Sequence, residues 1–143
     1  MTYLDPSHHI LRHVGESKID GDFIEPTVFR LKKDANTGQV EEGLSVNWVE
    51  YFRKSTVEEV VPELCEVFDK KGRKIAPKSK SQFALLNVAD AKAAAMRHCP
   101  VDIIRDPELN DPSHSLITGY QAYNDLVAEE LAKVVMRLYP ARP

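Results

Sequence analysis

The stretch 43–52 constrains the fold most, because it contains the only tryptophan of the chain, Trp48, and alternates like a β-strand. Leu44, Val46 and Trp48 form its heavier face. Burial of an indole ring removes about 150–250 Å² from water, which at ~25 cal/mol/Å² corresponds to about 4–6 kcal/mol. We therefore expect this strand to form the floor of the hydrophobic core.

The pattern around this strand predicts a single α+β domain over residues 1–143. A chain of 143 residues can bury about 68–70% of its unfolded surface, which is enough for a core without disulfides or metals. We expect a small, mostly antiparallel sheet packed by an amphipathic C-terminal helix and one central helix. Its expected strands lie near 27–33, 44–50, 83–88 and 100–104. The first two of these strands would form a hairpin with a long, charged tip.

Two amphipathic helices are expected. The central helix covers about 56–69, where Thr56 and Glu59 have the spacing of a capping box. Pro62 interrupts its apolar stripe and predicts either a kink or a fresh helix start. The closing helix covers about 122–138, where apolar residues recur at steps of four and three.

The N-terminal segment 5–14 allows two interpretations. It has an Asp-Pro start and a glycine after its end, which is typical of a short helix. Nine or ten residues are marginal for a helix, so a strand over 8–14 is the alternative. In either case His9 and His13 lie on one face.

Composition limits the class of protein. The formal net charge is −3, which argues against general affinity for nucleic acids. Cys65 and Cys99 form no Cys-x-x-Cys pair and are expected to be reduced thiols. No leader-like start and no apolar run of about 20 residues is present, so we expect a cytoplasmic protein with no membrane association.

Histidines supply the first candidate site. Three of them, His8, His9 and His13, lie within six positions and flank Arg12. Neutral imidazole suits both proton transfer and metal ligation. A metal site needs a third ligand, and His114 is the candidate.

The motif Asp-Pro-Ser-His at 5–8 recurs at 111–114, and the repeat would bring its histidines together if the two segments met in space. The alternative is that Asp-Pro-Ser simply favours a turn or a helix start. Asp102 and Asp106 are further carboxylates that could complete such a site. The expected catalytic residues are His9, Arg12, His13, Asp111 and His114, and the expected metal ligands, if a divalent metal is used, are His9, His13 and His114.

The basic loop 70–80 supplies the second candidate site. Lys70, Lys71, Arg73 and Lys74 would bind an anion, or else form a solvated loop that balances the acidic helix before it. Glycine-rich phosphate loops are absent, and so is the Gly-x-Ser-x-Gly elbow of hydrolases, so the sequence supports neither an organic cofactor nor a serine nucleophile.

Two classes of function follow. The first is a small interaction or regulatory protein with a protein partner or self-association, in which Tyr51, Phe52 and the basic loop form the contact surface. The second is a small hydrolase or transferase that acts on a phosphate-containing substrate, a nucleotide or a nucleic acid, through the His/Asp site.

Overall fold

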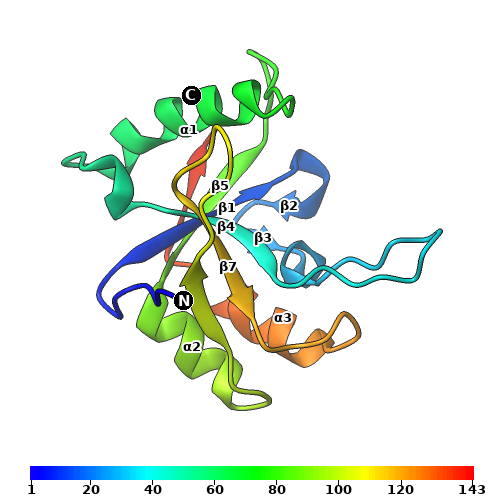
Figure 1. Cartoon of the computed structure of the whole chain (residues 1–143). Coiled ribbons are helices and arrows are strands. Elements are labelled where there is room, and N and C mark those ends of the chain that lie inside the picture. The colour runs from blue at the N-terminus through cyan, green and yellow to red at the C-terminus, as the bar shows by residue number, and fades with distance from the viewer.

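A six-stranded antiparallel sheet forms the centre of the molecule in the computed structural model, which describes all residues 1–143 (Figure 1). The strand order is β6-β7-β4-β1-β5-β8, and every neighbouring pair is antiparallel. The strands are β1 (His9–Val14), β4 (Leu44–Trp48), β5 (Gln82–Asn87), β6 (Asp102–Arg105), β7 (His114–Thr118) and β8 (Arg137–Pro140). A separate ribbon consists of β2 (Ile19–Asp20) and β3 (Phe23–Ile24). The expected α+β class and antiparallel sheet are confirmed.

Helices cover both faces of this sheet. Helix α1 (Val57–Lys70) lies on one face, and α2 (Val88–Met96) and α3 (Asp125–Lys133) lie on the other (Figure 1). Three short 3-10 helices, η1 (Glu16–Lys18), η2 (Pro26–Phe29) and η3 (Glu50–Phe52), lie in the connections. None of the helices combines the length and the apolar character that crossing a membrane requires.

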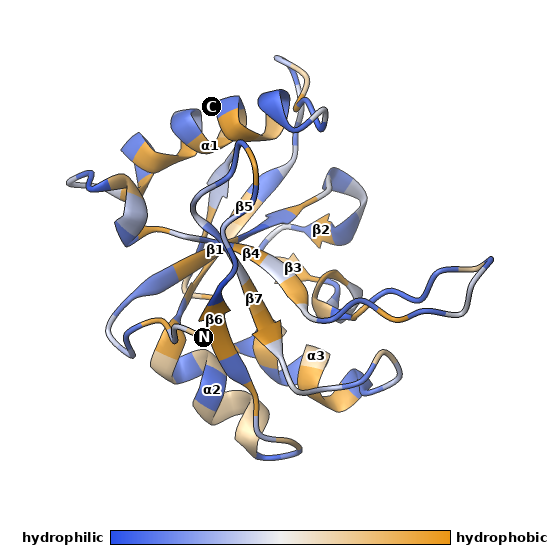
Figure 2. Cartoon of the chain, viewed as in Figure 1, coloured by the Kyte–Doolittle hydropathy of each residue, from blue (hydrophilic) through white to orange (hydrophobic).

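The two faces of the sheet carry separate apolar clusters. A cluster of 21 buried residues includes side chains of α2 and α3, and one of 12 includes the buried side chains of α1. Because successive side chains of a strand point to opposite faces, β1 contributes to both clusters. Ile10 belongs to the first cluster and its neighbour Leu11 to the second. Figure 2 shows the apolar flank of α1 turned toward the sheet.

The central helix is confirmed and is continuous. Thr56 caps α1, with its hydroxyl oxygen accepting a hydrogen bond of 3.3 Å from the backbone N–H of Glu59. Pro62 lies inside α1 without ending it. Its missing N–H removes one helical hydrogen bond, and burial of the stripe that includes Val60 and Leu64 outweighs that loss. The expected fresh start at Pro62 is therefore wrong.

The N-terminal segment is a strand, so its expectation as a helix is wrong and the alternative holds. Strand β1 pairs with β5 along its whole length, from His9 opposite Asn87 to Val14 opposite Gln82. Strand β1 also pairs with β4 at Ile10 and Leu11, and these two sets of pairings satisfy more backbone groups than a two-turn helix of marginal stability would.

Two other expected elements differ from the structure: the strand over 27–33 is absent, and the closing helix is shorter than expected. No strand occupies 27–33: η2 lies there, and the projecting arm beyond it contains one isolated bridge, between Lys33 and Val40. The closing helix ends at Lys133, and the chain returns as β8, which pairs with the edge of β5. Strand pairing and burial of Tyr139 override the helical period of this segment.

Trp48 is not the floor of the core. Its side chain is half-buried at the rim, stacked on His8 with ring centroids 5.5 Å apart and covered by the Arg105 guanidinium at 5.0 Å. Its indole N–H donates a hydrogen bond of 3.1 Å to Nδ1 of His8. The rest of the heavier face behaves as expected, with Leu44 and Val46 fully buried.

Candidate functional site

The sheet is split between β1 and β4. These strands pair only where Ile10 faces Trp48 and Leu11 faces Asn47, and beyond Leu11 strand β1 pairs with β5 alone. The side chain of Arg12 enters the split. Its Nε donates to the carbonyl oxygen of Val28 at 3.1 Å, and its Nη1 donates to the carbonyl oxygen of Ser45 at 2.8 Å. The guanidinium therefore replaces the strand pairing that is missing here.

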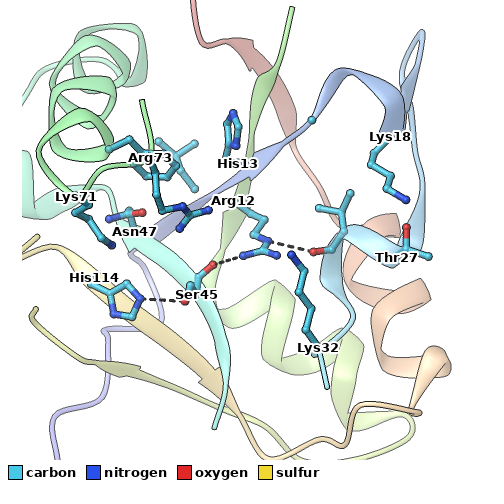
Figure 3. A pocket seen from close by; sticks show the side chains of 14 residues that line it. Arg12, His13, Lys18, Thr27, Lys32, Ser45, Asn47, Lys71, Arg73 and His114 are labelled. Atoms are coloured by element: carbon cyan, nitrogen blue, oxygen red, sulfur yellow. Dashed lines mark hydrogen bonds between the residues drawn. The ribbon is translucent and has the colours of Figure 1, made fainter. Parts of the chain in front are cut away.

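A cavity of about 230 Å³ opens at this split (Figure 3). It is lined by basic and polar side chains from distant parts of the chain. The labelled residues are Arg12, His13, Lys18, Thr27, Lys32, Ser45, Asn47, Lys71, Arg73 and His114. Five of its lining side chains are Lys or Arg, and none is Asp or Glu. The lining itself is therefore positive, and carboxylates lie next to it only where Lys18 and Lys71 form ion pairs.

Three of these cations have no carboxylate partner. Lys18 and Lys71 form ion pairs, whereas Arg12, Lys32 and Arg73 form none. Burial lowers the pKa of the Arg12 guanidinium from its usual value, because desolvation disfavours the charged form. This half-buried cation donates only to neutral carbonyl oxygens, so its charge is offset only in part, by the Glu41 carboxylate nearby.

Asp111, an expected catalytic residue, is fully buried behind the cavity. Its carboxylate accepts hydrogen bonds from Lys71 Nζ at 2.7 Å, Asn47 Nδ2 at 2.9 Å and Ser113 Oγ at 3.1 Å. Because these donors occupy its oxygens and it does not line the cavity, Asp111 does not contact a ligand there. The arrangement makes Asp111 the residue that positions Lys71.

His114 connects the cavity with a carboxylate. Its Nδ1 lies 2.9 Å from the main-chain carbonyl oxygen of Asp106 and 3.1 Å from Oδ2 of the same residue. Its Nε2 lies 3.0 Å from the hydroxyl oxygen of Ser45. Since a carbonyl oxygen only accepts, Nδ1 carries the proton, and Nε2 of the neutral ring accepts from Ser45.

The expected metal ligands are not assembled. His9 binds Glu50, with its Nδ1 donating at 2.7 Å, and it does not line the cavity. The one group of three candidate ligands with all atoms within 4.8 Å of one another consists of Asp106, Glu108 and His114. These oxygen and nitrogen donors suit a divalent ion such as Zn²⁺ or Mn²⁺.

His13 lines the cavity next to the apolar layer of α1. Its ring centroid lies 5.6 Å from that of Phe68 and 5.1 Å from that of Phe83, and its Nε2 is buried without a partner. Burial, with smaller contributions from Arg73 and Arg12, lowers the pKa of His13 from 6.5 to about 4. The ring is therefore neutral at physiological pH.

This lowered pKa predicts a pH-dependent loss of stability. Above pH 6.5 the ring is neutral in both states, and as the pH falls from 6.5 to about 4 only the unfolded chain takes up a proton. After allowance for solvent screening, we expect His13 to lower the free energy of unfolding by about 1–2 kcal/mol over this window. In urea unfolding at a series of pH values, His13→Leu should reduce the decline, and His98→Gln, at an exposed histidine, should keep it. An unchanged decline in His13→Leu would contradict the assignment.

The structure thus brings together five of the residues expected from sequence: Arg12, His13, Lys71, Arg73 and His114. Lys74 lines a neighbouring hollow, and Lys70 lines neither space. Sequence reasoning missed lining residues on the lighter face of β4 and in the arm before it. These residues are Ser45, Asn47 and Lys32, and the polar positions between the apolar ones in β4 were the available signal.

Tyr51, an expected contact residue, is 38% exposed and packs on the rings of Trp48 and Phe52. Phe52 is partly buried against the cluster that contains α1. Neither residue lines the cavity, so a partner surface at these two aromatic residues would be separate from it.

Comparison with known proteins gives no relative: no protein-family description fits the chain, and no curated protein or solved structure is significantly similar to it. The function is therefore inferred from the chemistry of the cavity.

Proposed function

We propose that this protein binds a small phosphate-bearing ligand in the cavity between β1 and β4. The observation that carries the proposal is the composition of the lining, with five Lys or Arg side chains and no carboxylate. Charged hydrogen bonds from guanidinium and ammonium groups to phosphate oxygens are among the strongest in proteins, and the planar fork of arginine fits them two at a time.

Unpaired cations supply the attraction. The charges of Arg12 and Arg73 repel each other, Arg12 is half-buried, and the exposed Lys32 adds a third unpaired cation to the lining. A bound dianion would relieve this repulsion without displacing any carboxylate from the lining.

The size of the cavity favours a small head group. About 230 Å³ is below the range of about 300–1,000 Å³ that is typical of sites for whole ligands. A neighbouring hollow of about 470 Å³ shares His13, Phe68 and Arg73 with it. A phosphate in the cavity with the rest of the molecule in this hollow, as in a sugar phosphate or nucleotide, fits both spaces.

Binding without chemistry is one form of this proposal. The protein would then act as an accessory or regulatory protein whose state follows ligand occupancy, with Tyr51 and Phe52 as the predicted contacts to a protein partner. Action on the phosphate-containing ligand, as a hydrolase or transferase, is the other form.

The proposal predicts that Arg73→Gln weakens phosphate binding about tenfold, because one charged hydrogen bond contributes about 1.5–3 kcal/mol. The measurement is calorimetric titration with inorganic pyrophosphate and with ribose 5-phosphate. Lys70→Gln is the matched control, since it removes a positive charge from the same region outside the cavity. We expect less than about a twofold change for this control.

Equal losses in both variants would mean that pyrophosphate responds to general charge and would contradict a specific site. Neutral ribose should not bind, and the affinity for ribose 5-phosphate should fall with added salt, because Lys32 and Arg73 are exposed and salt screens exposed charges.

A further inference from the structure

Ser45, His114 and Asp106 have the mutual geometry of a nucleophile, a base and an orienting acid. The hydroxyl oxygen of Ser45 lies 3.0 Å from Nε2 of His114, and Oδ2 of Asp106 lies 3.1 Å from Nδ1 of the same ring. Residues in these roles are recognised by geometry rather than by sequence position, and the constellation recurs on unrelated folds. Ser45 lies on a strand, not on a nucleophile elbow.

The surroundings hold this ring in one orientation. His114 is 4% exposed, its Nδ1 donates to the main-chain carbonyl oxygen of Asp106, and the carboxylate of the same residue lies 3.1 Å from that nitrogen. Its Nε2 points at Ser45, with the Glu108 carboxylate 3.7 Å away, outside hydrogen-bond distance. Lys71 Nζ lies 3.0 Å from that carboxylate and 2.7 Å from Asp111, so Glu108 shares this ammonium with Asp111.

Ser45 is open to the cavity that receives the anion. Its side chain is half-buried and lines that cavity together with His114 (Figure 3). The Arg12 guanidinium, which donates to the carbonyl oxygen of Ser45 at 2.8 Å, places positive charge beside the hydroxyl. Positive charge at this position would stabilise an oxyanion that forms on a carbonyl group attacked by Ser45.

We propose that Ser45 is the nucleophile of an esterase, with carboxylic esters that carry an anionic group as its substrates. Ser45 Oγ attacks the ester carbonyl carbon while His114 Nε2 takes the hydroxyl proton. The carbon–oxygen bond to the alcohol then breaks, and His114 returns the proton to the departing alkoxide. Water, deprotonated by His114, adds to the acyl-serine, the ester bond to Ser45 breaks, and the proton returns to Ser45. The net reaction is ester plus water to carboxylic acid plus alcohol.

The substrate class rests on the proposed function. An anionic group of the ester held by Arg12, Lys32 and Arg73 would place the carbonyl at Ser45, on the side of the cavity where His114 lies (Figure 3). Such positioning converts an encounter of two molecules into a reaction within one complex. A neutral ester of the same length would lack this anchor.

The experiment treats the full chain, with a chelator present, with diisopropyl fluorophosphate and locates the modification by peptide mass spectrometry. In parallel, hydrolysis of mono-(4-nitrophenyl) succinate is compared with that of neutral 4-nitrophenyl butyrate. We expect modification at Ser45 and a preference for the succinate ester of about tenfold or more.

Ser45→Ala should lose modification and lower ester hydrolysis at least about a thousandfold, and Asp106→Asn should lower it less. Ser17→Ala, at an exposed serine, is the matched control and should behave as wild type.

Absence of modification at Ser45 in a chain that binds pyrophosphate would overturn the esterase and leave the anion site in place. Modification at Ser45 with no preference for the succinate ester would overturn the anionic substrate class. Hydrolysis that is lost with the chelator, restored by Zn²⁺ or Mn²⁺ and retained in Ser45→Ala would overturn the serine mechanism in favour of a metal at Asp106, Glu108 and His114.

Discussion

Replacing Asp111 with alanine is expected to lower the free energy of unfolding by about 3–5 kcal/mol. The carboxylate is fully buried and accepts hydrogen bonds from Lys71, Asn47 and Ser113. Its removal takes the nearer of two carboxylate partners from the Lys71 ammonium, which is only 16% exposed and keeps Glu108 at 3.0 Å. It also removes the acceptor of the buried Asn47 amide and Ser113 hydroxyl. The measurement is urea unfolding near neutral pH, followed by circular dichroism.

Two further variants separate a buried ion pair from a general effect of losing negative charge. Asp22→Ala removes a carboxylate from an exposed turn and should change stability by less than about 0.5 kcal/mol. The double variant Asp111→Leu/Lys71→Met should recover only part of the loss, because it removes the buried ammonium but leaves Asn47 and Ser113 without the acceptor that Asp111 supplies. Similar unfolding midpoints for Asp111→Ala and Asp22→Ala would rule out the buried pair.

Asp111 also shows how far the repeated Asp-Pro-Ser-His motif could be interpreted from sequence. Both copies form the same turn, since the N–H of His8 donates to the carbonyl oxygen of Asp5 at 2.9 Å and that of His114 to Asp111 at 3.2 Å. Both turns lead into strands, β1 and β7, that flank β4. The turn preference of the motif was therefore predictable. The two histidines do not share a site, because His8 stacks on Trp48 whereas His114 bonds to Ser45.

Elements with strong local patterns were predictable, and those set by pairing were not. The cap and apolar stripe of α1 act within the helix itself, and β4 and β5 alternate or are continuously apolar in their own sequence. Strand β8 exists because the edge of β5 needs a partner, and its segment by itself has a helical period. The expected burial of Trp48 failed for a related reason, since the indole lies at the rim of the sheet.

In the candidate site, too, some residues were predictable from the sequence and others depend on how the strands pair. Residue type alone indicated Arg12, His13, His114 and the basic loop, because imidazole and guanidinium groups have few roles near neutrality. The cavity itself depends on where pairing between β1 and β4 stops, after Leu11 and Asn47, and no local pattern encodes that point. Ser45 acquires its role only through this split, so the absence of a hydrolase elbow motif gave no useful information about it.

Helix α1 gives the last prediction, because it positions the basic end of the cavity. We expect Leu64→Ala to lower the free energy of unfolding by about 3 kcal/mol through loss of transfer energy and creation of a cavity. Leu64 is fully buried between α1 and the sheet, whereas Leu126, on α3, is 53% exposed. Leu126→Ala is therefore the matched control, with an expected loss below about 1 kcal/mol. Thermal melting of both variants measures the difference, at about 2–4 °C per kcal/mol for a chain of this length.

The same pair of variants tests whether packing and anion binding are coupled. Lys71 and Arg73 follow directly after the last turn of α1 and enter the cavity from it. A helix held less tightly against the sheet would place these cations less accurately, so Leu64→Ala should also bind pyrophosphate more weakly at a temperature where it remains folded. Leu126→Ala should bind as wild type. Unchanged affinity in a clearly destabilised Leu64→Ala would show that the anion is held mainly by Arg12 and Lys32, from the strand side of the cavity.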